Sequence, residues 1–486
     1  MTSINKNLEW KPIQIILLLT LVQLFISLLT DGFALSFDEA MWHYIGRNWF
    51  RHGMTPYTGG VDNKSPLIFA VFGISDRLFG VNYWFPRVLG TVIQSIGIYY
   101  LFLIVKSKWS HSTAVLTALI YGLSLMWRST DGKLVSLTET YSITFLIISI
   151  RVFTSSTKAY APFVAGLWAS LSLGFRISAS FGIGAIFIFR FVNKDRQASM
   201  KFLGGLIFGV FLLMILAIFA GIHPSDFIQF AFIENFGKGS ATDHSFLWRL
   251  ENLSNGLFYS EMILFLPGVV AYLFIRKKWD FFVVWLLCEF IGLNIIGIYA
   301  RPHFKNLLPS LSVMTAVSII PLVEIFGLSP KKIAIAVCII FFPKLLEPFV
   351  SFKKIFRAPA DKSEQNCTPP YSSADDLAKK QLGLWIKANT DTTEKVLVAG
   401  YGAIVQAYSE RIAPSIYFNV TQTQKAKQHF INDINKTKPG MILVPGFSSY
   451  TVEVSDDLRN FIDEFTNKNY SLTGCKYGYK IYRLNK

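Results

Sequence analysis

The sequence predicts a polytopic α-helical membrane protein that carries a small α/β domain in its C-terminal part. Three observations predict this class. Of the 486 residues, 52% are hydrophobic and 16% are charged, whereas a soluble domain has about 25% charged residues. Apolar runs long enough to cross a bilayer recur as far as about residue 350. From about Arg357 onward the composition turns polar.

We expect about eleven membrane-spanning helices, because one span needs roughly 17 to 25 mostly apolar residues. They are expected near 13–35, 84–105, 112–127, 138–153, 160–175, 177–191, 202–222, 258–275, 281–299, 307–327 and 332–350. The first run has no small-residue cleavage site, which indicates a retained anchor rather than a signal peptide.

Lysine and arginine cluster in alternate connections between these runs. Examples are Lys106 with Lys108, and Arg151 with Lys158. The positive-inside rule places these loops and the N-terminus in the cytoplasm. An odd number of spans then places the C-terminal domain outside, as expected for a bacterial inner-membrane protein with a periplasmic domain. The net charge of +16 is explained by these loops, so no nucleic-acid partner is expected.

The two long outward connections, 36–83 and 223–257, hold most of the loop aromatics, histidines and acids. Function is therefore expected on the exoplasmic face, whereas a channel or carrier would place polar residues at mid-span. Residues 233–252 are glycine-rich and then aromatic. They are either a mobile lid over the acceptor or a disordered connection.

The predicted domains are 1–356, which spans the membrane, and 357–486, which is exported. In the second domain we expect strands at 395–400, 441–446 and 479–484, with helices at 374–389, 402–410 and 455–467. The stretch "GYGAIV", 400–405, lacks the third glycine of a dinucleotide fingerprint, so a strand-to-helix turn is favoured over a nucleotide site. Cys367 and Cys475 can form a disulfide if the domain is exported.

The stretch "SFDEAMWHYIG", 36–46, begins the first outer loop. Ser36 and Glu39 have the spacing of a capping box. Trp42, Ile45 and Trp49 recur at i, i+3 and i+7, which predicts an amphipathic helix in the membrane interface with its tryptophans in the headgroup layer.

The two adjacent acids of this stretch have different expected roles. Glu39 closes the start of the helix. Asp38 is not needed for the cap and points about 100° away from Glu39. Asp38 is either an acid favoured by the helix dipole or a general base that faces a cavity.

Four basic groups are candidates for contact with a phosphate at the outer interface. Lys64 precedes Pro66, Arg176 lies between two apolar segments, and Arg301 and His303 lie at the outer mouth of the tenth span. Each also has a plain interpretation. Lys64 can snorkel, Arg176 can face lipid headgroups, and His303 can be an ordinary loop histidine.

The motifs of residues 36–69 resemble those of the GT-C-fold glycosyltransferases of family 39 type, which include protein O-mannosyltransferases and bacterial transferases that add aminoarabinose to lipid A. The resemblance rests on the Asp38–Glu39 pair, the G-x-x-P-Y from Gly53 to Tyr57, the K-x-P-L from Lys64 to Leu67, and the exported domain. The family's Glu-Lys-Pro-Pro-Leu maps to 63–67, where this sequence has Asn63 and Ser65 instead of the acid and the first proline.

The resemblance implies transfer of a sugar from a polyprenyl-phosphate carrier to an acceptor lipid, glycan or protein, with inversion at the anomeric carbon. The family's catalytic acid maps to Asp38. A second family acid maps to Glu139 better than to Asp131, which is typical of a turn. The residues that support the site are Glu39, Tyr57, Asp62 and Asn63. A divalent metal is left open, because Asn63 replaces an acid unless Asp62 takes that role.

The alternative class is a flippase or transporter of a lipid-linked saccharide with an exported accessory domain. It predicts inverted repeats and broken mid-membrane helices, and neither is clear in the sequence. A purely structural or receptor-like membrane protein would leave the two acids of the first loop unexplained.

Overall fold

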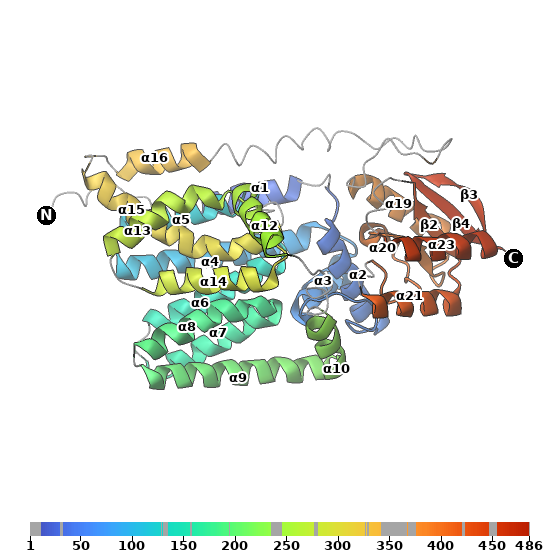
Figure 1. The fold of residues 1–486 in the computed structure, drawn as a ribbon, viewed down its shortest axis with the longest axis horizontal. Helices are drawn as coiled ribbons and strands as arrows, with labels where there is room; N and C mark the ends of the chain where they lie inside the picture. Colours follow the sequence, from blue (N-terminus) through green and yellow to red (C-terminus); the bar gives the residue numbers. More distant parts are fainter. Residues whose placement is uncertain are drawn as a thin grey trace. The chain divides into compact units, whose positions relative to one another are not determined.

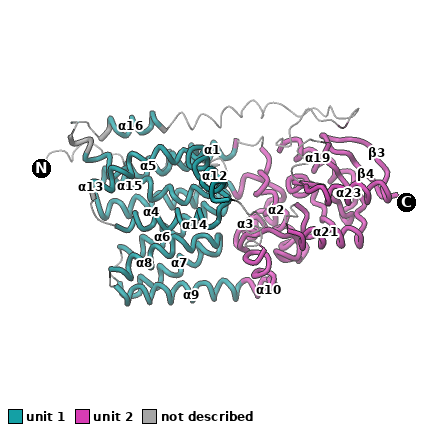
Figure 2. The backbone as a smooth tube through the Cα atoms, viewed as in Figure 1, with its two compact units in different colours: residues 1–28, 87–216, 243–350 teal, residues 29–86, 217–242, 351–486 magenta. Residues whose placement is uncertain are grey.

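A computed structural model gives the fold (Figure 1). It describes residues 11–29, 33–127, 129, 135–155, 158–193, 195–234, 245–276, 280–325, 327, 330–341, 367, 376–419, 423–446 and 454–485. The chain forms two compact units, each made of three separate segments (Figure 2). Unit 1 contains 1–28, 87–216 and 243–350, and unit 2 contains 29–86, 217–242 and 351–486. The predicted domain boundary near 356 lies outside the described residues.

Unit 1 is helical, and each predicted span contains a helix. The first half contains α1 (Pro12–Leu29), α4 (Trp84–Lys108), α5 (His111–Ser124), α6 (Thr138–Ser155), α7 (Ala161–Phe175), η3 (Ile177–Ala179), α8 (Ser180–Val192) and α9 (Arg196–Phe219). The second half contains α12 (Phe246–Tyr259), η5 (Met262–Phe265), α13 (Leu266–Arg276), α14 (Phe281–Ile296), η6 (Arg301–Leu307), α15 (Leu308–Ile325) and α16 (Pro330–Phe341).

Several of these helices have the length and composition of membrane spans. Within the described part of the chain, four qualify by themselves: Pro12–Leu29, Trp84–Lys108, Arg196–Phe219 and Arg301–Pro321. The pair Phe246–Tyr259 and Met262–Ile275 qualifies only together and is bent by 73°. The prediction of a membrane protein agrees with these helices. The total of eleven spans stays a prediction, because other apolar helices, such as α7 and α14, are shorter than these.

Small residues and hydrogen bonds join the apolar helices of unit 1. Lipid is as apolar as leucine, so close packing and polar pairs hold helices together in a membrane. A Cβ at Gly166 of α7 would lie 2.2 Å from the carbonyl oxygen of Phe202 on α9. Between α1 and α4, the amide of Gln94 donates to Gln23 Oε1 at 3.2 Å.

Unit 2 combines the segment between α1 and α4 with the C-terminal α/β fold. From the first two segments come α2 (Phe37–His52), α3 (Pro66–Phe79), α10 (Pro224–Phe227) and the π-helix η4 (Ile228–Ile233). From the third come α19 (Asp376–Asn389), β1 (Val396–Val398), α20 (Ala403–Ser409), α21 (Gln424–Thr437), β2 (Met441–Pro445), α23 (Asp456–Asn469), β3 (Tyr470–Lys476) and β4 (Tyr479–Leu484).

The sheet of unit 2 has the order β1-β2-β4-β3, with β1 parallel to β2 and the other pairs antiparallel. Alternate side chains of the strands face opposite sides of the sheet, and each side packs into its own hydrophobic core. Leu397 and Ile442 pack with α21 and α23, whereas Val396 and Leu443 pack with α19 and α20. The three predicted strands and three predicted helices are confirmed, and sequence analysis missed β3 and α21. Cys367 and Cys475 form a disulfide, with their Cα atoms 5.2 Å apart.

The turn at 400–405 joins β1 to α20, as the plain interpretation of "GYGAIV" predicts. Gly400 has φ +77°, which favours glycine. A Cβ at Gly402 would lie 2.6 Å from the side chain of Val398. Both glycines therefore have a structural reason to be there.

The helix predicted after Ser36 is α2, and it ends at Gly53 in the left-handed conformation, φ 69°. The prediction that its tryptophans lie in a headgroup layer is wrong for Trp42. That side chain is 1% exposed, and its Nε1 donates to Asp62 Oδ2 at 2.8 Å. The reason is tertiary: α2 packs on α3 and α20, and Trp42 on its apolar face contacts Phe72 of α3, so protein rather than lipid headgroups covers that side chain.

Candidate functional site

The predicted site residues fall in both units. Unit 2 contains the first-loop residues Asp38, Glu39, Tyr57, Asp62, Asn63 and Lys64. Unit 1 contains Glu139, Arg176, Arg301 and His303. Each group is described in its own unit.

The structure separates the two acids at the start of α2. Glu39 is fully buried, and its carboxylate accepts from the Ser36 backbone N–H at 2.8 Å. This contact is the carboxylate half of the predicted capping box. Asp38, in the same first turn, is half-buried. Glu39 is thus occupied in holding the helix start, and Asp38 is the more accessible of the two carboxylates.

The loop between α2 and α3 is held by Tyr57. Its φ of 75° is unusual for a residue with a bulky side chain, and its ring is buried. The Tyr57 hydroxyl donates to the carbonyl oxygen of Lys64 at 2.6 Å, and the ring stacks on Phe230 of η4 at 5.8 Å. Tyr57 therefore fixes the backbone that carries Lys64, and its supporting role in the site stays a prediction.

Asp62 is used within the protein. Its Oδ2 accepts from Trp42 Nε1, and its Oδ1 accepts from the Asn63 N–H at 2.7 Å. Among the described residues, no group of three or more His, Cys, Asp or Glu side chains could hold a metal ion. Because both oxygens of Asp62 already accept hydrogen bonds within the protein, the donor set around Asp62 and Asn63 does not fit a metal.

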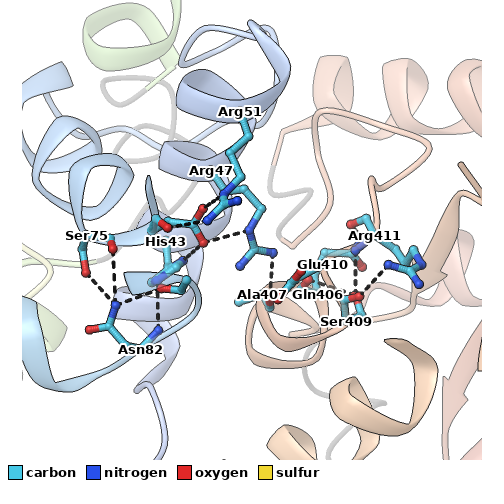
Figure 3. A network of polar contacts seen from close by, with 12 residues as sticks. His43, Arg47, Arg51, Ser75, Asn82, Gln406, Ala407, Ser409, Glu410 and Arg411 are labelled. Carbon is cyan, nitrogen blue, oxygen red and sulfur yellow. Dashed lines mark hydrogen bonds and ion pairs between the residues drawn. The ribbon is translucent and has the colours of Figure 1, made fainter. Parts of the chain in front are cut away.

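A buried charged cluster that sequence analysis missed centres on Asp76 of α3. Figure 3 shows its members His43, Arg47 and Arg51. Arg47 Nε donates to its Oδ1 at 3.0 Å, and Arg51 pairs with its Oδ2. Arg47 Nη1 also donates to the carbonyl oxygen of Ala407 in α20 at 2.8 Å. This cluster joins α2 and α3 to the C-terminal segment of the same unit.

The charge states of this cluster follow from burial and from neighbouring charges. Burial, with Arg47 beside it, lowers the pKa of His43 to about 3. His43 is therefore neutral at pH 7, and its Nδ1, 3.6 Å from Asp76 Oδ1, makes no ion pair there. Burial opposes ionisation of Asp76, but Arg47 and Arg51 outweigh it and hold the pKa of that carboxyl below its ordinary value. Asp76 is thus a fixed anion between two guanidinium groups.

In unit 1 two predicted residues, 37 positions apart, form a buried ion pair. Arg176 Nη1 contacts Glu139 Oε1, and both side chains are mostly buried. Arg176 lies in extended conformation between α7 and η3, and its Nε donates to Ser178 Oγ at 2.5 Å. Glu139, in the first turn of α6, also accepts from Thr138 Oγ1 at 3.0 Å. The competing candidate Asp131 lies outside the described residues.

Arg176 lines a small pocket, with room for about one water molecule, whose other lining residues come from η3, α8, α14 and η6. Its polar groups are Arg176, Ser178, Glu289, His303 and Asn306. Sequence analysis missed Glu289, a single acid within the apolar helix α14. Glu289 Oε2 accepts from Asn306 Nδ2 at 3.1 Å, and Oε1 accepts from Trp285 Nε1 at 3.3 Å. An ionisable residue in such a helix is by default a functional candidate.

The remaining basic candidates differ in their exposure and in whether they line the pocket. His303 lines the pocket and is half-buried. Arg301 begins η6 and is exposed, and it is not among the residues that line the pocket. Lys305, two residues after His303, is buried. Unit 1 therefore brings Glu139, Arg176 and His303 together, and it leaves Arg301 at the surface.

Comparisons with known proteins bear on the fold. No protein-family model matches the sequence, and no curated protein matches it. Among solved structures, ArnT from Cupriavidus metallidurans bound to undecaprenyl phosphate matches 97% of both chains, with 12% identity and a TM-score of 0.59. The same protein in the apo state also matches 97% of both chains, with 12% identity and a TM-score of 0.62.

An archaeal structure matches as well. The Archaeoglobus fulgidus oligosaccharyltransferase, tethered to an acceptor peptide, covers 98% of this chain and 74% of its own, with 11% identity and a TM-score of 0.55. These likenesses extend over nearly the whole chain and give it the GT-C fold. At such low identities they establish the fold and not the reaction.

Proposed function

We propose, starting from the GT-C fold that the chain shares with these proteins, that it is an inverting glycosyltransferase. It would move a sugar from a polyprenyl-phosphate donor to a lipid, glycan or protein acceptor on the exoplasmic face. The observation that carries the proposal is the buried Arg176–Glu139 pair beside a polar pocket, at a break between two apolar helices. A protein of the same fold is known with undecaprenyl phosphate bound.

In the proposed reaction an acceptor hydroxyl or amine attacks the anomeric carbon, the bond from that carbon to the phosphate oxygen breaks, and polyprenyl phosphate leaves. Asp38 accepts the acceptor's proton as general base. Lys64, Arg176, Arg301 and His303 are the candidates to stabilise the negative charge that develops on the leaving phosphate. Arginine suits this role because its guanidinium can contact phosphate with two N–H groups.

Glu139 is proposed to orient Arg176 rather than to take a proton. An arginine left unpaired among apolar helices would be costly, and a carboxylate partner fixes both its charge and its direction. Thr138 and Ser178 each add a hydrogen bond to this pair. The arrangement keeps the cation in place before the donor lipid arrives.

The proposal places the C-terminal segment in an oxidising compartment, which for a bacterial inner-membrane protein is the periplasm. The Cys367–Cys475 disulfide supports this location, because such bonds form and persist outside the reducing cytosol. The positive residues of the alternate loops support a cytoplasmic N-terminus.

The test works whichever sugar the donor carries. Purified protein is incubated with the total lipid extract of the source cells, and released undecaprenyl phosphate is measured by mass spectrometry. We expect release by the wild-type protein and at least a hundredfold slower release by Asp38→Asn, which should still bind the lipid. Glu39→Gln is the neighbouring control and should lose stability rather than turnover. Lipid-linked sugar that is translocated unchanged by both the wild type and Asp38→Asn would overturn the proposal in favour of a flippase.

A further inference from the structure

We propose that Tyr417 and Glu234 are positioning residues, which act through Tyr57 to hold Lys64 in place. The inference rests on the proposed function, in which Lys64 is a candidate to contact the leaving phosphate. It gives the C-terminal α/β fold a part in that function. All four residues belong to unit 2, although they come from three segments that are far apart in the sequence.

Tyr417 is anchored in the C-terminal fold. Ser415 Oγ donates to Asp433 Oδ2 of α21 at 2.7 Å, and the Tyr417 backbone N–H donates to Ser415 Oγ at 3.2 Å. The Tyr417 side chain is buried and belongs to the hydrophobic core that the sheet forms with α21 and α23. Its ring is therefore held by the α/β fold and can serve as a fixed point for another segment.

Tyr417 binds the segment of η4 by two contacts. Its hydroxyl donates to Glu234 Oε1 at 3.0 Å, and its ring lies edge-on to Phe230, with 6.4 Å between the ring centroids. Burial and the nearby Glu234 carboxylate raise the pKa of Tyr417, so the hydroxyl stays protonated and donates. Glu234 directly follows η4, a π-helix, and such turns are rare and frequent at functional sites. The α/β fold thus holds η4 within its length and at its end.

The segment of η4 in turn holds the loop that carries Lys64. The Tyr57 ring stacks on Phe230 with 12° between the ring planes, and the Tyr57 hydroxyl donates to the carbonyl oxygen of Lys64 at 2.6 Å. The positive φ of Tyr57 is a strained conformation, which persists only where the surroundings enforce it. A second link is direct, because the Val61 N–H donates to the carbonyl oxygen of Ile416 at 3.0 Å.

The side chain of Lys64 is left available by this arrangement. It is half-buried, and its amine makes no hydrogen bond or ion pair within the described part of the chain. A lysine amine is a point charge on a flexible stem, so its direction depends on the backbone that carries it. Misplacing a group by about 1 Å can slow a reaction by about 10²-fold. A fixed loop therefore matters more here than it would for a residue whose own contacts hold it.

The first experiment asks whether Tyr417 acts through Lys64. Release of undecaprenyl phosphate from the total lipid extract of the source cells is measured for the wild type, Tyr417→Phe, Lys64→Met and the double variant. We expect Tyr417→Phe, which keeps the ring, to slow release by about fivefold. In the Lys64→Met background the same change should slow it by no more than about twofold. Glu234→Gln keeps an acceptor for the hydroxyl and should stay near the wild-type rate, whereas Glu234→Ala should match Tyr417→Phe.

The second experiment does not depend on turnover. Amide hydrogen exchange of the full-length protein in nanodiscs is followed in the peptide that covers 57–64. Tyr417→Phe should speed exchange there by about fivefold and leave the strands of the sheet unchanged. Tyr470→Phe is the matched control, because its buried hydroxyl donates to the carbonyl oxygen of Pro439 at 2.7 Å and joins β3 to the connection between α21 and β2. It should change neither the exchange of the loop nor the release rate.

Three results would overturn the inference. They are equal slowing by Tyr417→Phe in both backgrounds, unchanged exchange of the loop in that variant, and faster exchange throughout the α/β fold. The last result would show that Tyr417 only supports the fold. Failure of the proposed function would look different, because the wild-type protein would release no undecaprenyl phosphate while Tyr417→Phe would still loosen the loop.

Discussion

Each unit of the molecule contains a buried acid paired with arginine, and the two clusters differ in what surrounds them. In unit 2, Asp76 and Arg47 are 1% and 3% exposed and are enclosed by α2, α3 and α20. In unit 1, the Arg176–Glu139 pair borders a pocket that contains an unused acceptor on Asn306. Buried charge by itself therefore does not identify a site. Open space beside the charge, with polar atoms facing it, is the better sign.

The comparison predicts that the Asp76 cluster is chiefly structural. Asp76→Asn leaves two guanidinium groups without their anion, and breaking a buried pair costs about 3 to 5 kcal/mol. We expect the melting temperature of the detergent-purified protein to fall by about 10 °C. Arg77→Ala is the control, because Arg77 lies next to Asp76 but is exposed, and it should change little. If the melting temperature of Asp76→Asn stayed within 2 °C of that of the wild type, the Asp76 cluster would not have a structural role.

The Arg176 cluster should respond in activity more than in stability. Arg176→Gln should slow undecaprenyl phosphate release by about 10² to 10³, the usual effect of removing one group that stabilises developing charge. The double variant Glu139→Gln with Arg176→Gln removes both charges and leaves neither buried alone, so its melting temperature should stay close to that of the wild type. Its transfer rate should stay low. Recovery of transfer in the double variant would show that the pair only supports the fold.

Acid should weaken unit 2 through His43. The pKa of His43 is lowered to about 3 in the folded protein, and its ordinary value is 6.5, so between these values the unfolded chain binds a proton that the folded chain does not. Stability therefore falls as the pH drops below 6.5, by up to about 1.4 kcal/mol per pH unit. Asp76 adds to the loss only below its ordinary value of 3.8, since its pKa is lowered further. Melting curves from pH 7 to pH 5 check this, and His43→Gln should flatten the dependence. An equal slope in that variant would contradict the assignment.

The smallest expected effect concerns Ser178. Its hydroxyl accepts from Arg176 Nε, and a single hydrogen bond of this kind is worth about 0.5 to 1.5 kcal/mol. Ser178→Ala should slow transfer by about fivefold and leave the melting temperature unchanged. Ser180→Ala, an exposed serine two residues later, is the matched control. A larger loss in Ser180→Ala than in Ser178→Ala would show that the turn itself matters rather than this bond.

Much of the fold could be predicted from the sequence, because hydrophobic runs report directly on apolar helices and buried strands. The strand β3 was missed because "YSLTGCK" is mostly exposed, and it carries an irregular register between Leu472 and Gly474. Trp42 was misplaced because a helical wheel shows which face is apolar but not what covers it, and that face packs partly on α3 rather than on the membrane.

The site could be predicted only where a motif or a break in a span marked it. Arg176 stands out as a charge between apolar runs, and Glu139 follows from the family resemblance. Glu289 is one acid among sixteen residues of α14 and barely changes their hydropathy, and its partner Asn306 lies 17 positions further along. Asp76 could not be predicted for the same reason, because its partner Arg47 lies 29 positions before it in the sequence. Such pairings depend on tertiary contacts that no local pattern contains.

The hydrogen bond from Arg47 to Ala407 spans 360 positions, and this has a consequence for biosynthesis. A ribosome adds about 5 to 20 residues per second, so α2 leaves it roughly 20 to 70 s before its carbonyl partner exists. During that interval the Arg47 guanidinium can pair with Asp76, but it lacks its carbonyl partner in α20. This part of unit 2 can therefore complete its hydrogen bonds only when translation is nearly finished.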